Sequence, residues 1–495
     1  MDRSCKINKS SGGLAQHFRQ IAHLEGRGGK TRLPVAGRSC RTGPNWNKSK
    51  KTGEMTMKKT LALLLALVML LALAACGNGD SNASNTDTPA NSDNSNTQSP
   101  DPSPEDGNEP EPVELSGDPI KIGHIADLTG VEAMTGQEAV RSLEFAVKYI
   151  EAHGGIDGRP IEICLEDSQS NAATAADAAR KLVEDEGVVA ILGPTQAGHK
   201  STVAGYVSTA GVPAIYYNGT AVMQIQNNEY VIGAGGGMPE MPTAMADYLY
   251  NDLGLRTICT ITQDNAGGKG YMDPLIENFE ALGGTVAVKH YTPVPTADFG
   301  TYLVNLPAET EALVCWVSGS DAIALWTAWY EMGLSDRMPM YGSTHGGFTD
   351  HFICSALMAS NPDIVEAMLK DTIVPIMYSY SSDHQENVEF VEAWVEEYGE
   401  VPLGTNLPGA CCQALMLLKE AIESIDGNTE PEALYQALQS VEVTGPEGHL
   451  YFEDGMRAAT KDVHIAKLVR LEDGSFNYEV IKTYPDVPAN GLPVG

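Results

Sequence analysis

One stretch of the chain comes close to a phosphate-binding loop. Residues 193–201 read Gly-Pro-Thr-Gln-Ala-Gly-His-Lys-Ser and follow an apolar run that is typical of a buried strand. A P-loop has the pattern G-x-x-x-x-G-K-[ST], because its backbone N–H groups and its lysine together hold the phosphates. Here His199 is inserted before Lys200, and one extra residue turns a helical side chain by about 100°. We therefore expect no nucleotide phosphate at this loop.

Motifs for hydrolytic or metal chemistry are not found either. The sequence has no H-E-x-x-H zinc motif and no G-x-S-x-G nucleophile turn. No cysteine or histidine spacing indicates a metal site, so Cys164, Cys259, Cys315, Cys411 and Cys412 are expected to be buried free thiols. A Ser/His/Asp set that converges only in the folded chain remains an alternative. The prediction is a protein without a metal, a cofactor or catalytic residues.

The elements that position side chains follow an alternating pattern. Apolar runs predict strands, and apolar residues at helical spacing predict helices between them. The predicted strands are 120–126, 161–165, 188–192 and 214–216, and, after the pattern restarts near Met241, 257–261, 285–290 and 312–317. This order predicts an α/β fold with two Rossmann-like lobes, each a parallel sheet flanked by helices. Ligands of such sheets bind at the carboxyl ends of the strands.

Charge is unevenly distributed along the chain. The net charge is −33, yet residues 1–75 contain 14 Lys and Arg against three Asp and Glu. The rest of the chain is therefore strongly acidic, and nucleic acid is excluded as a partner for it. Residues 76–118 are rich in Asn, Ser, Asp, Pro and Glu, and are expected to form a disordered acidic tether.

An export signal is predicted at residues 57–75. The apolar run 61–75 follows two lysines, and its 15 residues would reach about 22 Å as a helix, short of the ~30 Å hydrocarbon core. Leu73-Ala-Ala-Cys76 resembles the lipobox of bacterial lipoproteins, which implies lipidation of Cys76 as the first mature residue. The alternatives are a cut after Ala75 or an uncleaved anchor.

Residues 1–56 stand before this signal. They are polar and basic, and exporters read signals at the start of a chain. We interpret them as a wrongly assigned upstream extension, with Met57 or Met55 as the true first residue. A basic arm that binds nucleic acid is the alternative.

Four stretches carry a resemblance to a known family. Residues 120–130, 154–163, 190–194 and 211–215, in this order and spacing, resemble the substrate-binding proteins of branched-chain amino acid ABC transporters. This Leu/Ile/Val-binding family has the type I periplasmic-binding-protein fold, and the similarity covers 119–485. It implies three interlobe crossovers, with lobe 1 at 119–237 plus 383–443 and lobe 2 at 238–382 plus 444–485. It also implies a receptor whose hinge closes on a small solute outside the cytoplasm and whose closed form meets membrane permease subunits, and a monomer is the default expectation.

The resemblance also assigns ligand contacts in lobe 1. The family's carboxylate-binding serine falls on Ala197, which leaves the backbone N–H groups of a helix start and Gly198 as donors. In the next loop the Asn218 carbonyl would accept from an ammonium and Thr220 would donate to a carboxylate, with Gly219 between them. The alternative role of Thr220 is to cap the following helix.

Three further ligand contacts are implied. Asp321 stands where the family's acidic residue meets the ligand ammonium, although a first-turn acid of a helix is an equally ordinary role. Thr135 replaces a family tyrosine, and residues 265–270 lack another. The resemblance therefore implies a roomier or more polar pocket, in which Tyr271 compensates.

Two other functions remain open at this point. The chain could be a sensor that presents its closed form to a signalling receptor, or an enzyme outside the cytoplasm. Branched-chain amino acids, other amino acids, small amides and aromatic acids all suit the scaffold as ligands.

Overall fold

The computed structural model describes residues 114–493, except 131, 297 and 344–348. All of these residues belong to one compact unit, Glu105–Gly495. The predicted signal, Cys76 and most of the predicted tether lie outside the described residues. Within the described part, no helix combines the length and the apolar composition needed to cross a membrane.

The first sheet is parallel and has the strand order β2-β1-β3-β4-β5. Its strands are β1 (Ile120–Ala126), β2 (Ile161–Asp167), β3 (Ala190–Leu192), β4 (Ala214–Ile215) and β5 (Val231–Ile232). The connecting helices are α3 (Ala133–Ala152), α4 (Ala172–Lys181, continued by a π-helical turn at Leu182–Glu186), α5 (Ala197–Ala210) and α6 (Val222–Gln226). β1 is buried along almost its whole length, as expected for a strand with helices on both faces.

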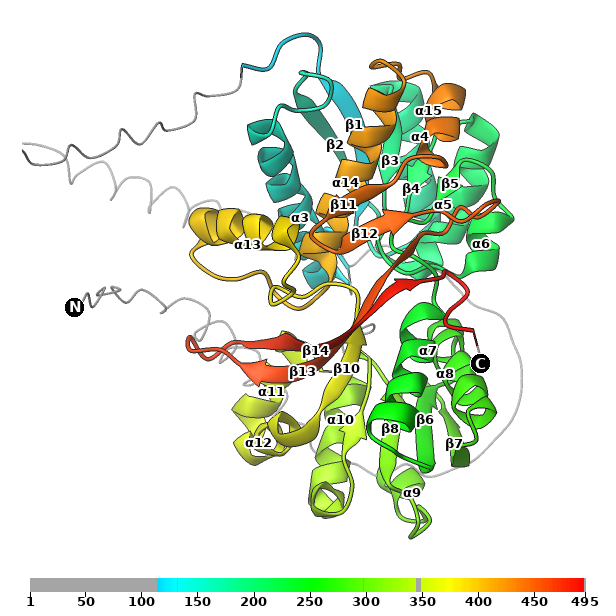
Figure 1. The fold of residues 1–495 in the computed structure, drawn as a ribbon, viewed down its shortest axis with the longest axis vertical. Helices are drawn as coiled ribbons and strands as arrows, with labels where there is room; N and C mark the ends of the chain where they lie inside the picture. Colours follow the sequence, from blue (N-terminus) through cyan, green and yellow to red (C-terminus); the bar gives the residue numbers. More distant parts are fainter. Residues whose placement is uncertain (1–113, 131, 297, 344–348, 494–495) are drawn as a thin grey trace, which may run out of the picture. The chain divides into compact units, whose positions relative to one another are not determined.

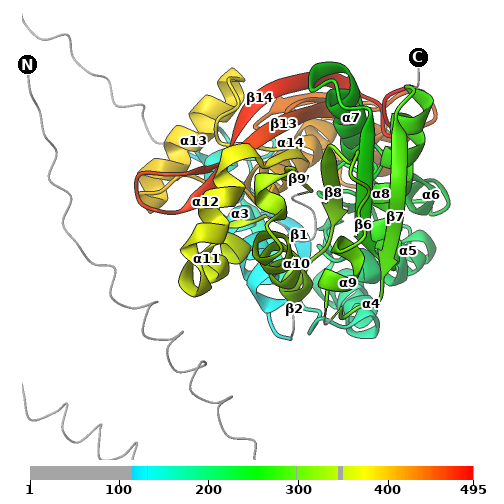
Figure 2. The same cartoon turned by 90° about the horizontal axis from the view of Figure 1, so that it is seen from below.

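The second sheet repeats this topology with the order β7-β6-β8-β9. Its strands are β6 (Thr257–Gln263), β7 (Thr285–Thr292), β8 (Ala312–Trp316) and β9 (Met340–Tyr341), and Figure 2 shows the first three side by side. The accompanying helices are α7 (Glu240–Asp247, continued by a π-helical turn at Tyr248–Asp252), α8 (Ala266–Ala281), α9 (Gly300–Leu303), α10 (Gly319–Glu331), a 3₁₀ turn (Leu334–Asp336), α11 (His351–Ser360) and α12 (Pro362–Asp371). The predicted fold class of two parallel α/β sheets is confirmed.

A third, antiparallel sheet is a feature that the strand pattern did not predict. Its strands are β10 (Ile373–Ile376), β11 (Val443–Gly445), β12 (Gly448–Tyr451), β13 (Thr460–Arg470) and β14 (Phe476–Val487). β13 and β14 pair over most of their length and form the long ribbon in the middle of Figure 1. β11 and β12 form a hairpin that turns at residues 446–447.

The core of the first sheet includes three helices from the last third of the chain. These helices are α13 (Gln385–Tyr398), α14 (Leu407–Ser424) and α15 (Pro431–Leu438), and Figure 1 shows α14 beside α3. Phe145 of α3 packs edge-on against Phe390 and Trp394 of α13, at ring centroid distances of 5.3 and 4.8 Å. Such aromatic contacts add to the stabilisation from buried apolar area. The C-terminal helices therefore complete a core that the N-terminal strands begin.

Among the described residues between 234 and 463, the chain crosses three times between the cores of the two parallel sheets. Each crossing is marked by neighbouring residues that pack in different cores: Ala234 and Met241, Met377 and Tyr378, and Ala459 and Val463. The side chains of Val443 and Leu450 pack in the core of the first sheet, whereas the resemblance assigns residues 444–485 to lobe 2. By packing, the β11–β12 hairpin thus lies with the first sheet.

Three titratable side chains are buried where the crossings meet, and we name Glu240, Glu447 and Lys461 the crossover cluster. The Lys461 ammonium donates to the Glu447 carboxylate, and both side chains are at most 2% exposed. Glu240, at the start of α7, is 0% exposed, and a Cβ added to Gly236 would run into its carboxyl group. Burial raises the pKa of Glu240 well above its usual range, and the Lys461 charge offsets only part of this effect.

Candidate functional site

A polar cluster lies where the strand order of the first sheet reverses, between β1 and β3. Such switch points form the ligand crevice of open α/β sheets. Asp127, directly after β1, is 1% exposed and accepts a hydrogen bond from the Ser168 hydroxyl at 2.5 Å. Its other carboxyl oxygen, Oδ2, has no hydrogen-bond partner among the described residues. His199 of α5 places its Nδ1 3.4 Å from Asp127 Oδ1. The carboxyl edge of this sheet is therefore polar and densely packed.

The loops after β3 and β4 are bonded to each other at this edge. Thr195 and Tyr217 share a hydrogen bond of 2.5 Å between their hydroxyl groups. The Asn218 side-chain amide donates to the Thr195 carbonyl at 3.0 Å. These bonds join the loop after β3 to the loop after β4 in one polar rim at the carboxyl edge of the first sheet.

Lys200 joins this rim from the first turn of α5, and its side chain is 0% exposed. Its ammonium donates to the carbonyls of Asn218 (2.9 Å) and Gly219 (3.1 Å) and to the Thr220 hydroxyl oxygen (2.8 Å). Burial lowers the pKa of Lys200 to about 7. Three predicted ligand residues therefore come together in the structure, around an ammonium from the protein itself.

The second sheet has a matching cluster at its own switch point, between β6 and β8. Asp321, in the first turn of α10, is 4% exposed. Its Oδ2 accepts from the Gln263 side-chain amide and from the Thr296 backbone N–H, both at 3.1 Å. The Ser318 hydroxyl in turn donates to the Gln263 side-chain carbonyl at 2.9 Å. Asp321 thus ties together the loops that follow β6, β7 and β8.

The other predicted ligand residues are more dispersed. Thr135 lies half-buried in the first turn of α3, and Gly198 is exposed in the first turn of α5, which begins at Ala197. Tyr271 of α8 is 2% exposed within the second sheet's core, where burial raises the pKa of its hydroxyl. Trp316, the last residue of β8, has an indole N–H without a hydrogen-bond partner among the described residues.

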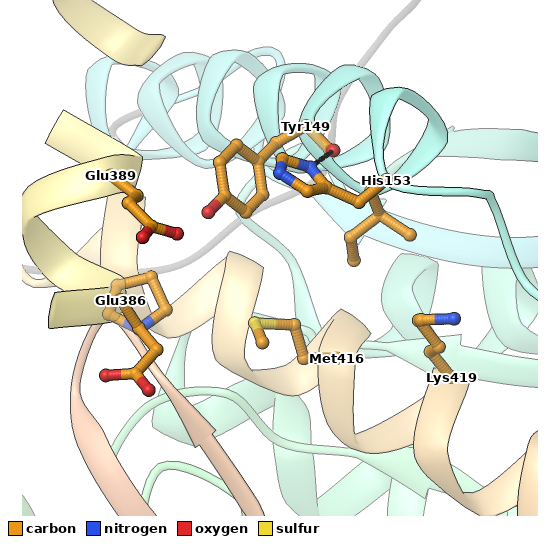
Figure 3. A pocket seen from close by; sticks show the side chains of 8 residues that line it. Tyr149, His153, Glu386, Glu389, Met416 and Lys419 are labelled. Atoms are coloured by element: carbon orange, nitrogen blue, oxygen red, sulfur yellow. Dashed lines mark hydrogen bonds between the residues drawn. The ribbon is translucent and has the colours of Figure 1, made fainter. Parts of the chain in front are cut away.

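Two surface cavities lie away from both switch points. The first, about 210 Å³, is bordered by α3, α13 and α14, with Tyr149, His153 and Glu389 among the side chains that Figure 3 shows around it. The His153 ring nitrogen Nδ1 lies 2.6 Å from the Tyr149 carbonyl oxygen. The second, about 460 Å³, is lined by residues around α10 and α12, including Tyr330 and Lys370. None of the predicted ligand residues lines either cavity.

Metal and thiol chemistry find no support in the described part of the chain. No group of three or more His, Cys, Asp or Glu side chains there is arranged to hold a metal ion. The cysteines at 164, 259, 315, 354, 411 and 412 are free thiols, and all but Cys164 are buried. The side chains at the two switch points can instead bind a ligand through hydrogen bonds and charge.

Comparison with known proteins identifies the family. Residues 119–475 match the family model described as periplasmic binding protein. The chain belongs to that family. Leu/Ile/Val-binding protein homolog 6 of Brucella melitensis biotype 1 is 20% identical over 381 residues, which cover 76% of this chain and 94% of that protein. Membership of the periplasmic binding protein family implies a place outside the cytoplasm.

Solved structures have the same fold. An ABC transporter substrate-binding protein from Sphaerobacter thermophilus is 28% identical, with a TM-score of 0.66 over 75% of this chain and 99% of that one. A solute-binding protein of an ABC transporter from Rhodopseudomonas palustris BisB5, in complex with 3,4-dihydroxybenzoic acid, is 21% identical, with a TM-score of 0.64 over 75% and 99%. These relatives of our periplasmic binding protein are binding proteins and not enzymes. The resemblance read from the sequence is confirmed.

Proposed function

We propose that this periplasmic binding protein is the lipid-anchored solute receptor of an ABC importer. It captures an amino acid or a similar small amino or carboxylate solute between its two parallel sheets. The observation that carries the proposal is the pair of buried polar clusters at the two switch points, one on each sheet, joined by three crossovers. A solute that contacts both clusters has higher affinity for a closed arrangement, and so shifts the hinge toward closure.

The relatives support this class of solute. One is named a Leu/Ile/Val-binding protein homolog, and one was solved with 3,4-dihydroxybenzoic acid. Both kinds of molecule are small and carry a carboxylate. In our protein, the start of α5 offers backbone N–H groups and partial positive charge toward such a group, since the Gln196 side chain does not cap it.

Substitution of Asp321 tests the second cluster. We expect Asp321→Ala to weaken solute binding by about 1.5–3 kcal/mol, roughly ten- to hundredfold in Kd, because two hydrogen bonds to a charged group that organise the site are lost. A thermal-shift screen of amino acids and small carboxylates on the full chain finds the solute, and calorimetry then gives Kd. Glu309→Ala, at an exposed position nearby in the sequence, is the control. Equal Kd values for all three proteins would remove Asp321 from the site.

The anchor needs a separate test, because Cys76 lies outside the described residues. We expect Cys76→Ser to move the protein from the membrane fraction to the soluble fraction and to abolish labelling with a palmitate analogue. Buried acyl chains contribute about 0.8 kcal/mol per CH₂ group, so their loss removes the attachment. Cys164→Ser is the matched control. Persistent lipid labelling of the Cys76 variant would refute the lipobox.

A further inference from the structure

Lys200 has a buried amine whose hydrogen-bond partners are all neutral oxygens. A protonated amine has three N–H donors and no acceptor, and each donor of Lys200 has one partner in the segment 218–220. Two of these partners are backbone carbonyls and the third is a hydroxyl oxygen. The other fully buried lysine among the described residues, Lys461, instead pairs with a carboxylate, that of Glu447. We name residues 218–220 the ammonium loop.

The lysine is fixed at both ends. The Tyr216 hydroxyl donates to the Lys200 backbone carbonyl at 2.8 Å, and the Tyr216 ring centroid lies 5.5 Å from the ammonium nitrogen. The Thr220 hydroxyl donates to the Asn218 carbonyl at 3.1 Å, which keeps the loop closed around the charge. The Lys200 side chain is thus held in place as a fixed part of the carboxyl edge of the first sheet.

We infer that the ammonium loop is an amine-binding subsite which Lys200 keeps occupied, so that the solute of this protein carries a carboxylate but no ammonium group. The inference rests on the proposed solute-binding function and narrows its substrate class to small organic acids without an amine. The ammonium of an α-amino acid could enter the loop only by displacing the Lys200 amine, which would leave that buried amine without its three hydrogen-bond acceptors. Lys200 and the start of α5 instead both add positive potential for a carboxylate.

Chemical rescue tests the subsite without knowledge of the solute. Lys200→Ala removes the atoms of propylammonium, so we expect millimolar propylammonium chloride to raise the Tm of this variant by about 2 °C or more. Propylammonium should not change the Tm of the wild-type protein or of Lys289→Ala, in which a partly exposed lysine is replaced. Sodium chloride and 1-propanol control for salt and for the uncharged chain. A variant that folds by circular dichroism but shows no shift overturns the inference.

Matched solutes test the same inference on the unaltered full chain, which keeps it open to refutation if Lys200→Ala does not fold. The pairs are leucine with 4-methylpentanoate and phenylalanine with 3-phenylpropanoate, and calorimetry compares Kd within each pair. We expect the acid without the amine to bind at least tenfold more tightly. Equal or tighter binding of the amino acid overturns the inference and leaves the receptor function standing. If no small solute in the screen binds, the receptor function fails, and the rescue experiment alone decides the role of Lys200.

Discussion

Replacing Glu447 by alanine is expected to lower the free energy of unfolding by about 3–5 kcal/mol. The substitution leaves the Lys461 ammonium buried without its carboxylate partner, and an unpaired buried charge is far more costly than a lost exposed ion pair. Denaturant unfolding of the full chain, with wild-type protein in parallel, measures the difference.

Two further variants show whether the unpaired charge is the cause. Glu442→Ala breaks an exposed pair with His449 on the same hairpin and is expected to cost less than about 1 kcal/mol. The double variant Glu447→Leu with Lys461→Met removes both charges and should recover most of the lost stability. Equal decreases in the free energy of unfolding for Glu447→Ala and Glu442→Ala would contradict this account of the crossover cluster.

Glu240→Gln is expected to act in the opposite direction and to stabilise the protein at neutral and alkaline pH. The pKa of Glu240 is raised in the folded state, so unfolding releases its proton at any pH between the unfolded and folded pKa values. Stability from this group is therefore lost as the pH rises above about 4.5, at about 1.4 kcal/mol per pH unit until the folded pKa is reached. A neutral glutamine has no such penalty.

The measurement is the difference in unfolding free energy between Glu240→Gln and the wild-type protein from pH 5 to pH 9. We expect the difference to favour the variant and to grow with pH. Glu229→Gln, at an exposed position, should show no such trend. A constant difference across the pH range would mean that Glu240 is not the titrating group.

Much of the two parallel sheets could be predicted from the sequence, because their strands are short apolar runs that local composition reveals. The run 120–126 coincides with β1, and 312–317 overlaps β8 to within one residue. The two long strands of the antiparallel sheet, β13 and β14, are not such runs, because both mix charged and apolar residues. β14 alternates half-buried and exposed residues along much of its length, and its pairing with β13 depends on contacts between distant segments.

Part of the candidate site could also be predicted from the sequence, and part could not. The family resemblance assigns Asp321 and the loop 218–220, which the structure places at the carboxyl edges of the two sheets. In the sequence, Lys200 stands out only as part of a broken phosphate-loop pattern. The partners of Lys200 are mainly backbone carbonyls. Because every residue has a carbonyl, the residue types in a sequence do not indicate which carbonyls will accept a hydrogen bond.

β13 has a mechanical consequence for the closure proposed above. Near its start, Lys461 pairs with Leu450 of the hairpin that packs with the first sheet, while His464 to Lys467 pair with β10 beside the second. One uninterrupted strand therefore belongs to both halves, and its hydrogen bonds prevent the halves from sliding past each other. In the proposed closure we expect the halves to rotate about this strand, and the register shift between Lys461 and Val463 in its pairing with β14 is the place where its local twist can change.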